Sequence, residues 1–161
     1  MQGRYSIFAS VGNATQPFER FLRMVDEAAG QTGRTALIQT GGRGAFQPSH
    51  ADAVDFVTRE RFEELLREAD YVVTHAGVGS VMSAVRLGKL PIVVARRKGL
   101  GEHVNDHQLE LAHELSSLGW CRVVVTPDEL VACFQQPPAA VAPGEQISNQ
   151  RMRELVSDFI R

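Results

Sequence analysis

The sequence contains no long run of apolar residues. Its longest apolar stretches, such as Tyr71–Thr74 and Ile92–Ala95, are far shorter than the ~20 residues that a bilayer-spanning helix needs. The first 13 residues include a basic side chain but too short an apolar run for a signal peptide. These absences predict a cytoplasmic protein without a transmembrane helix.

The sequence also lacks a strong charge of one sign and is poor in cysteine. A net charge of −2, with 22% charged and 43% hydrophobic residues, is typical of a soluble globular protein and argues against a nucleic-acid partner. The two cysteines, Cys121 and Cys133, fall at the start of an expected strand and inside an expected helix. We therefore expect reduced, packed thiols rather than a disulfide framework or a metal knuckle.

The 161 residues are sufficient for one domain with a real core. Short Val- and Ile-rich runs alternate with segments whose apolar residues recur at helical spacing. The expected strands are 5–11, 35–40, 54–57, 71–74, 90–95 and 122–125. This alternation predicts an α/β fold with a doubly wound, Rossmann-like parallel sheet covered on both faces. Residues 1–135 would form its body, 136–145 a Pro/Ala linker, and 146–161 a final helix of the same domain.

The most informative motif is Thr74–Ser80, where an expected strand turns into a helix. Gly77 and Gly79 would allow a tight turn, so that free N–H groups, the helix dipole and the Ser80 hydroxyl converge where a diphosphate could lie. The motif is not a dinucleotide fingerprint, because Met82 stands where the third glycine would be, and no Walker A lysine follows any glycine run. A glycine-rich turn can also be a purely structural connection, so both interpretations stay open.

A second polar segment follows the expected strand 90–95 and leads into a helix. Its hydrogen-bonding residues are Glu102, His103, Asn105, Asp106, His107, Gln108 and Glu110. Placed amides and carboxylates discriminate sugar hydroxyls, because an unpaired buried polar group costs about 1–3 kcal/mol. The alternative is a solvated helix N-terminus that Asn105 or Asp106 caps.

Other chemistries lack the residues that they need. His103 and His107 could share a helix face, but His113 lies six residues further on and no third ligand completes a zinc site, so we expect no metal. Ser80 does not stand in the G-x-S-x-G elbow of a hydrolase. The basic run Arg96–Lys98 could face a diphosphate or an anionic membrane, or could simply be a solvated loop.

Taken together, these segments resemble the C-terminal, donor-binding domain of glycosyltransferase family 28. The matching segments are Val11–Gly12 before Phe18, Gln39–Gly41, Thr74–Ser80, Leu87–Pro91 and Glu102–Ala112. The resemblance implies the C-terminal half of a two-domain GT-B enzyme. It also implies a split arrangement, in which a membrane-anchored acceptor-binding subunit supplies the other half. The pair Glu102-His103 favours the bacterial exopolysaccharide members over the dolichol-linked chitobiose transferases.

By this resemblance the protein is the nucleotide-sugar-binding subunit of an inverting transferase that moves a sugar from a UDP-sugar to a lipid-linked acceptor, without a cofactor. Its binding residues would be Gly12, His75, Gly77, Val78, Gly79, Ser80, Ser83, Asp106, His107 and Gln108. Gly77–Ser80 would hold the diphosphate, Asp106–Gln108 would meet the donor sugar, and Gly12 with His75 would flank the pocket. The general base would come from the partner, so no catalytic residue is assigned here.

One position departs from the family pattern. Ser83 stands where many members carry an acidic residue that binds the ribose hydroxyls, and a serine can make only one such bond. This departure favours one alternative, a non-catalytic accessory subunit of the same fold. A free-standing enzyme acting on a phosphorylated metabolite is a second alternative. The apolar stripe of the final helix could dock on its own sheet or cross to the partner, and the sequence leaves homo-oligomers open.

Overall fold

The computed structural model describes residues 3–12, 16–42, 44, 46–141 and 154. Its centre is a parallel sheet with the strand order β3-β2-β1-β4-β5-β6. The strands are β1 (Ile7–Ser10), β2 (Ala36–Gln39), β3 (Asp52–Val54), β4 (Tyr71–His75), β5 (Ile92–Val94) and β6 (Arg122–Val123). The predicted doubly wound α/β domain is confirmed.

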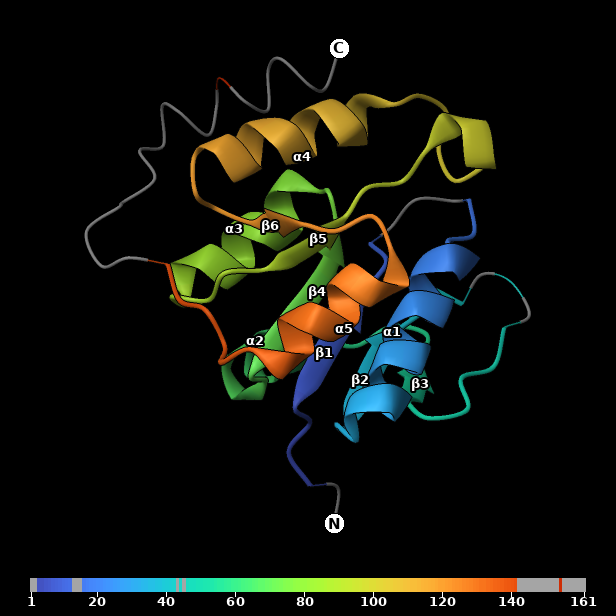
Figure 1. Ribbon diagram of the computed structural model, residues 1–161, viewed down its shortest axis with the longest axis vertical. Helices are drawn as coiled ribbons and strands as arrows, with labels where there is room; N and C mark the ends of the chain where they lie inside the picture. The colour runs from blue at the N-terminus through green and yellow to red at the C-terminus, as the bar shows by residue number, and fades with distance from the viewer. Residues whose placement is uncertain (1–2, 13–15, 43, 45, 142–153, 155–161) are drawn as a thin grey trace.

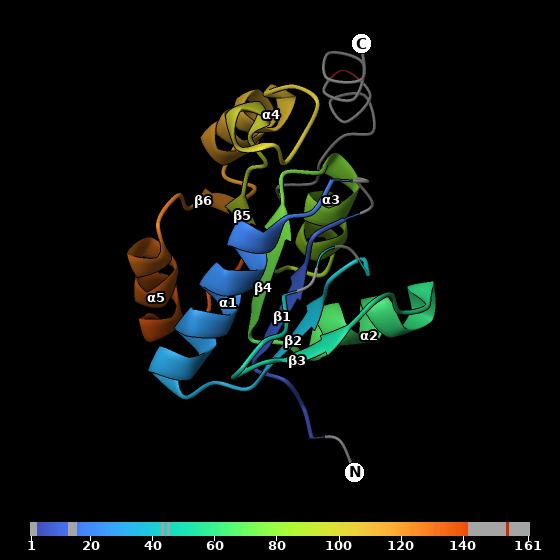
Figure 2. The same ribbon diagram turned by 90° about the vertical axis from the view of Figure 1, so that its right-hand side faces the viewer.

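Helices cover both faces of this sheet (Figures 1 and 2). The helices are α1 (Glu19–Thr32), α2 (Arg59–Glu68), α3 (Val78–Arg86), α4 (His107–Ser117) and α5 (Pro127–Gln135), with a short 3-10 helix η1 (Lys98–Leu100) before α4. Figure 2 shows α1 and α5 on one side of the sheet and α2 and α3 on the other. None of these described helices is long and apolar enough to cross a bilayer.

The apolar residues explain this layering. Ile7 and Ala9 point into the cluster beneath α1 and α5, whereas Phe8 between them packs on the opposite side against Phe62 of α2, with 5.4 Å between ring centroids. Successive strand residues face opposite sides of a sheet. Because helices cover both sides, the strands read as continuous apolar runs rather than as alternating ones.

Helix boundaries follow local capping chemistry. The Thr58 hydroxyl accepts a hydrogen bond from the Arg61 N–H at the start of α2, and the Thr126 hydroxyl accepts one from the Glu129 N–H at the start of α5. Pro127 occupies the first turn of α5, as predicted.

The third strand lies earlier in the chain than predicted. We expected residues 54–57, but the paired residues are Asp52–Val54, next to Leu37–Gln39 of β2. The prediction followed apolar residues, whereas β3 is an edge strand whose first two residues are exposed. Backbone pairing, rather than burial, defines this strand.

The start of the expected Pro/Ala linker is held against the body. Ala140 forms an antiparallel bridge with Lys89, and the Val141 N–H donates to the Gly88 carbonyl at 3.2 Å. The rest of the linker and the expected helix of 146–161 lie outside the described residues, apart from Glu154. Cys121 and Cys133 are buried free thiols, as expected, and burial raises the pKa of Cys121 to about 12.

The order of the strands places the site. The chain runs outward from β1 through β2 to β3, and then returns to β4 on the other side of β1. Ligands of such sheets bind at the carboxyl ends of the strands where the order reverses. Here the reversal lies between β1 and β4, where Ser10 pairs with Thr74.

Candidate functional site

An open cavity of about 540 Å³ lies at this carboxyl edge of the sheet. Its lining residues are Ser10, Gly12, Gln39, Phe56, Val57, Arg59, Phe62, Gly79, Ser80 and Ser83. The predicted residues Gly12, Gly79, Ser80 and Ser83 are therefore brought together from the loop after β1 and from α3. The structure adds an apolar wall from the segment between β3 and α2.

His75 sits at the centre of the predicted residues, between two glycines. A Cβ atom on Gly12 would lie 2.2 Å from His75 Nε2, and one on Gly77 would lie 2.4 Å from His75 Cε1. Neither position can carry a side chain while the imidazole keeps its place. We call Gly12, His75, Gly77, Gly79 and Ser80 the glycine cradle.

The structure gives a different reason for glycine at positions 77 and 79 than the sequence did. We expected Gly77 and Gly79 to permit a tight turn, but neither has a positive φ, and Gly77 has φ −105°. Gly77 instead makes room for the His75 ring, and a Cβ on Gly79 would meet open space. Only Gly12, with φ +77°, needs glycine for its backbone conformation as well.

Helix α3 begins at the cradle and directs its N-terminus there. Gly77 is its N-cap and makes no side-chain capping bond, and the first residues of the helix are Val78, Gly79 and Ser80. Their N–H groups precede any carbonyl that could accept them within the helix. This end carries the positive pole of the helix dipole and suits an anion.

The imidazole of His75 is uncharged at neutral pH. Burial, then the positive charge of Arg96, then that of His103 lower the pKa of His75 to about 4. Its Nε2 lies 3.4 Å from Ser80 Oγ and its Nδ1 lies 3.3 Å from Gln108 Nε2. The cradle therefore offers a neutral hydrogen-bonding ring next to the helix N-terminus.

The residues predicted to meet a sugar are bonded within their own loop. Gln108 is buried, and its Oε1 accepts the Arg96 N–H at 3.0 Å. Asp106 is the N-cap residue of α4, but its carboxylate accepts the Lys98 N–H at 2.8 Å instead of capping the helix. The predicted residues His75, Gly77 and Val78 do not line the cavity, and neither do Asp106, His107 and Gln108, although Gln108 reaches His75. The contact of residues 106–108 with a sugar stays a prediction.

Asn105 stabilises the start of α4 from the position before the N-cap, while the N-cap residue Asp106 makes no side-chain capping bond. The Oδ1 of Asn105 accepts the His107 N–H at 3.0 Å, at the entrance of α4. The segment is thus both a structured helix start and the source of Gln108. Among the residues that the structure describes, no three His, Cys, Asp or Glu side chains lie close enough together to hold a metal ion.

Arg96 is the residue whose role the sequence interpretation missed. We considered an anion contact or a solvated loop, but its side chain is fully buried. It donates to the carbonyls of Val11 and Gln16 at 2.8 Å and of Glu102 at 3.0 Å. Its guanidinium carbon lies 4.7 Å from the centre of the Phe18 ring. The only sequence signal was its place directly after a buried strand.

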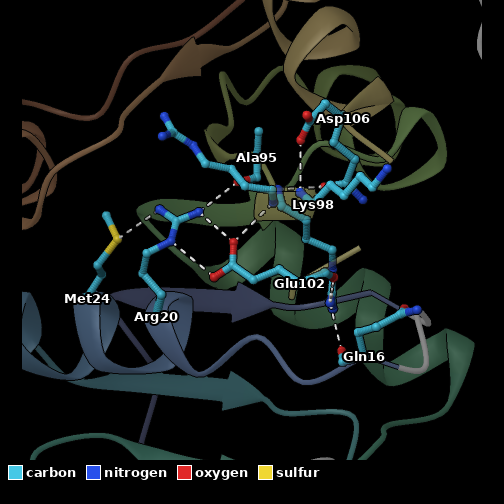
Figure 3. A network of polar contacts seen from close by, with 10 residues as sticks. Gln16, Arg20, Met24, Ala95, Lys98, Glu102 and Asp106 are labelled. Atoms are coloured by element: carbon cyan, nitrogen blue, oxygen red, sulfur yellow. Dashed lines mark hydrogen bonds and ion pairs between the residues drawn. The ribbon is translucent and has the colours of Figure 1, made fainter. Parts of the chain in front are cut away.

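A partly buried ion pair between Arg20 and Glu102 accompanies Arg96. The Glu102 carboxylate accepts hydrogen bonds from Arg20 Nη2 at 2.9 Å and Nε at 3.1 Å, as Figure 3 shows, and from the Arg97 N–H at 3.1 Å. Burial lowers the pKa of Arg96 and the Glu102 charge raises it in part. We call Arg96, Glu102 and Arg20 the Arg96 clamp. It ties the loop after β1 to α1 and to the loop after β5.

Ser10 and Gln39 form the floor of the cavity. Gln39 Nε2 donates to Ser10 Oγ at 3.0 Å, and Gln39 Oε1 accepts the Val57 N–H at 3.0 Å. This amide therefore positions the segment that carries the apolar wall. Sequence reasoning had placed Gln39 in a family segment without giving it a contact, because its partner lies 18 residues away in the chain.

Comparison with known proteins identifies the family and the fold of this chain. Residues 6–152 match the glycosyltransferase family 28 C-terminal domain. The subunit ALG13 of a UDP-N-acetylglucosamine transferase from Yarrowia lipolytica is 35% identical over 116 residues, which cover 63% of this chain and 56% of the relative. The human subunit of the same name is 31% identical over 115 residues, covering 65% of this chain but 10% of its own length.

Solved structures share the fold at low sequence identity. The solution structure of ALG13 superposes with a TM-score of 0.63 at 20% identity and 98% coverage of both chains. The calicheamicin glycosyltransferase CalG4 gives a TM-score of 0.60 at 18% identity, covering 96% of this chain and 38% of the other. The family match over most of the chain, together with this fold, shows that the protein belongs to the glycosyltransferase family 28 C-terminal domain family.

Proposed function

We propose that this protein is the donor-binding subunit of a split, inverting glycosyltransferase that uses a UDP-sugar. The observation that carries the proposal is the start of α3 at the cavity, where Gly79 and Ser80 line the space at the N-terminal end of the helix and His75 Nε2 lies 3.4 Å from Ser80 Oγ. A diphosphate placed there meets a helix dipole and hydroxyl donors and no nearby carboxylate of the cradle. The names of the curated relatives support UDP-N-acetylglucosamine as the donor.

The apolar wall of the cavity suits the nucleoside end of such a donor. Phe56 is 57% exposed, and Phe62 and Val57 line the cavity beside it. An exposed aromatic ring at a cavity offers a stacking face to a flat base. Arg59 also lines the cavity, and its exposed side chain lies 3.8 Å from the Glu63 carboxylate.

Transfer requires more than this chain offers. An inverting reaction needs a general base for the acceptor hydroxyl and stabilisation of the departing diphosphate. The N-terminus of α3 is suited to the second task. We assign the base, the lipid-linked acceptor and the anchor at the cytoplasmic face of a membrane to a partner subunit. The relatives' description as subunits supports a partner, and exopolysaccharide or glycolipid synthesis is the pathway class that we propose.

The experiment that tests donor binding is calorimetric titration of the full chain with UDP and a panel of UDP-sugars. The critical variant is Gly79→Glu, with Gly79→Gln as its neutral control of similar size. A Cβ at Gly79 meets no atom within 4 Å, and a carboxylate in the first turn of a helix favours folding, so both variants should fold. We expect native binding, a modest loss in Gly79→Gln and a much larger loss in Gly79→Glu. Equal affinity of the two variants would contradict a diphosphate at α3.

One observation favours an accessory subunit as the second candidate. The Ser83 hydroxyl, at the place of the family's acidic residue, donates to the Gly79 carbonyl at 2.8 Å rather than standing free for a ribose. An accessory subunit would activate a partner transferase without holding the donor. No binding of UDP by the native chain, alone and with its partner, would favour this candidate.

A further inference from the structure

The orientation of the Gln108 side-chain amide follows from its partners. One end lies 3.0 Å from the Arg96 backbone nitrogen, and the other lies 3.3 Å from His75 Nδ1. A backbone N–H can only donate, so the end facing Arg96 must be the carbonyl oxygen. The end facing His75 is therefore the NH₂ group, which can only donate.

The direction of that bond decides the tautomer of His75. A donor from Gln108 needs a lone pair on Nδ1, so the proton of the neutral ring resides on Nε2. The Nε2–H then donates to Ser80 Oγ, 3.4 Å away. Because Ser80 accepts this bond, its own hydroxyl proton is left to point elsewhere, and its side chain lines the cavity.

We propose that Gln108 is a positioning residue that sets the Nε2–H tautomer of His75 and thereby makes the Ser80 hydroxyl a donor to an oxygen of the ligand in the cavity. The ligand part of this inference rests on the proposed function, with a diphosphate oxygen as the acceptor. Gln108 itself need not touch the donor. The opposite tautomer would make Nε2 an acceptor, draw the Ser80 proton to the ring and present only lone pairs to an anion.

The packing around His75 keeps this arrangement in place. Gly12 and Gly77 hold the ring between them, and the Arg96 clamp fixes the backbone N–H that orients Gln108. A hydrogen-bond chain thus runs from the Arg96 backbone through Gln108 and His75 to Ser80. The end of the chain that faces the cavity is a hydroxyl proton.

The first test reads the tautomer without any ligand. Two-bond 1H–15N correlation spectra of the full chain distinguish the protonated ring nitrogen from the bare one, and loss of the signal in His75→Gln assigns it. We expect protonated Nε2 and bare Nδ1 in the native protein, and the reverse in Gln108→Glu. An ionised glutamate carboxylate can accept from the Arg96 N–H but cannot donate to Nδ1, so we expect the ring to carry a proton on Nδ1 that it donates to the carboxylate. A bare Nε2 in the native chain would overturn the inference.

The second test is a double-mutant cycle on UDP affinity with Ser80→Ala and Gln108→Glu. A hydrogen bond to a charged group corresponds to roughly tenfold or more in affinity, so we expect that loss from Ser80→Ala in the native background. In the Gln108→Glu background the same change should alter affinity by less than about twofold, because the hydroxyl no longer donates to the ligand. The single variant Gln108→Glu and the double variant with Ser80→Ala both carry the added glutamate charge, so its effect on UDP affinity cancels in this comparison.

The outcomes separate this inference from the proposed function. Failure of the native chain to bind UDP, both alone and with its partner, overturns the proposed function and the ligand part of the inference, while the spectra still decide the tautomer. UDP binding with an equal effect of Ser80→Ala in both backgrounds overturns the inference and leaves the proposed function standing. If Gln108→Glu does not fold, the spectrum of the native chain still decides the tautomer of His75. The loss of UDP affinity in Ser80→Ala still decides whether the Ser80 hydroxyl bonds the ligand.

Discussion

The glycine cradle and the Arg96 clamp lie at the same edge of the sheet and are built by opposite means. In the cradle, missing side chains make room for one neutral ring, and no carboxylate or cation belongs to it. In the clamp, a fully buried guanidinium satisfies three backbone carbonyls beside a buried carboxylate. The comparison separates a surface prepared for an anion from the framework that holds this surface in position.

The difference between the two regions shows where charged and neutral side chains can be buried at this edge of the sheet. A buried charge is costly unless it is paired and hydrogen-bonded. In the clamp Arg20 pairs with Glu102 and three backbone carbonyls accept from the Nη atoms of Arg96, whereas Arg96 Nε has no hydrogen-bond partner among the described residues. A cationic clamp placed inside the cradle would bind any anion, whereas the neutral cradle uses directed donors. The clamp is expected to govern stability, and the cradle is expected to govern binding.

The largest loss of stability should come from Arg96→Met, which removes the central residue of the Arg96 clamp. Removing the guanidinium leaves the carbonyls of Val11, Gln16 and Glu102 without their donor, and we expect a loss of about 3–5 kcal/mol in the free energy of unfolding. Urea titration measures it. Arg97→Met is the matched control, because the neighbouring side chain is only partly buried, and it should cost less than about 1 kcal/mol. Similar losses in both variants would show that Arg96 is no framework residue.

Gly12→Ala should break the cradle from its β1 side. The new Cβ would lie 2.2 Å from His75 Nε2 at φ +77°, so steric displacement adds to backbone strain, and we expect about 2–4 kcal/mol of destabilisation. Gly33→Ala separates the two causes, because Gly33 has φ +66° but open space around its Cβ position. It should cost only about 1 kcal/mol, as measured by thermal unfolding. Equal costs would mean that His75 gives way freely.

The neutral ring of His75 predicts a pH dependence of stability. Its pKa is about 4 in the folded protein, against 6.5 for an unperturbed histidine, so between these values the unfolded chain binds more protons. Stability should therefore decline as pH falls through this window, by up to about 3 kcal/mol for this group. Urea titrations at several pH values check it. His75→Gln should remove this part of the slope, and an unchanged slope would contradict a neutral buried ring.

A second group extends the acid sensitivity to lower pH. Burial raises the pKa of Asp26, but the backbone N–H groups of Ser49, His50 and Ala51 outweigh it, and the net pKa is lowered. Its stabilising effect is present above the ordinary carboxyl pKa and is lost as pH falls through the lowered value. The Asp26→Asn variant should thus be less stable than the native chain above the ordinary carboxyl pKa, and this difference should shrink as pH falls through the lowered pKa of Asp26, which urea titrations from neutral to low pH would detect.

The smallest effect should be a slight gain in stability from Gly79→Ala. A Cβ at this position meets no atom within 4 Å, and alanine in a helix is favoured over glycine by up to about 1 kcal/mol. Thermal unfolding should show roughly 0.5 kcal/mol of stabilisation. Gly77→Ala, two residues earlier, should destabilise instead, because its Cβ would lie 2.4 Å from His75 Cε1. The opposite signs would show that only one of the two glycines serves the ring.

Much of the fold was predictable because its signals are local. Apolar runs and helical spacing identified the alternation of strands and helices, and Pro127 marked the start of α5. The exposed edge strand β3 was placed too late, since pairing without burial leaves little trace in composition. Of the site, Gly12, Gly79, Ser80 and Ser83 were predicted and line the cavity, whereas Phe56 and Arg59 were not foreseen.

The sequence by itself determined the parallel α/β architecture and the turn into α3, because both depend on residues close together in the chain. Only the tertiary structure decided why Gly12 must be a glycine, because the ring that excludes its Cβ arrives from β4, more than 60 residues later. The same holds for Arg96, whose carbonyl partners at Val11 and Gln16 come from the loop after β1. Burial and hydrogen-bond partners depend on which strands become neighbours in the sheet, and local pattern does not contain that information.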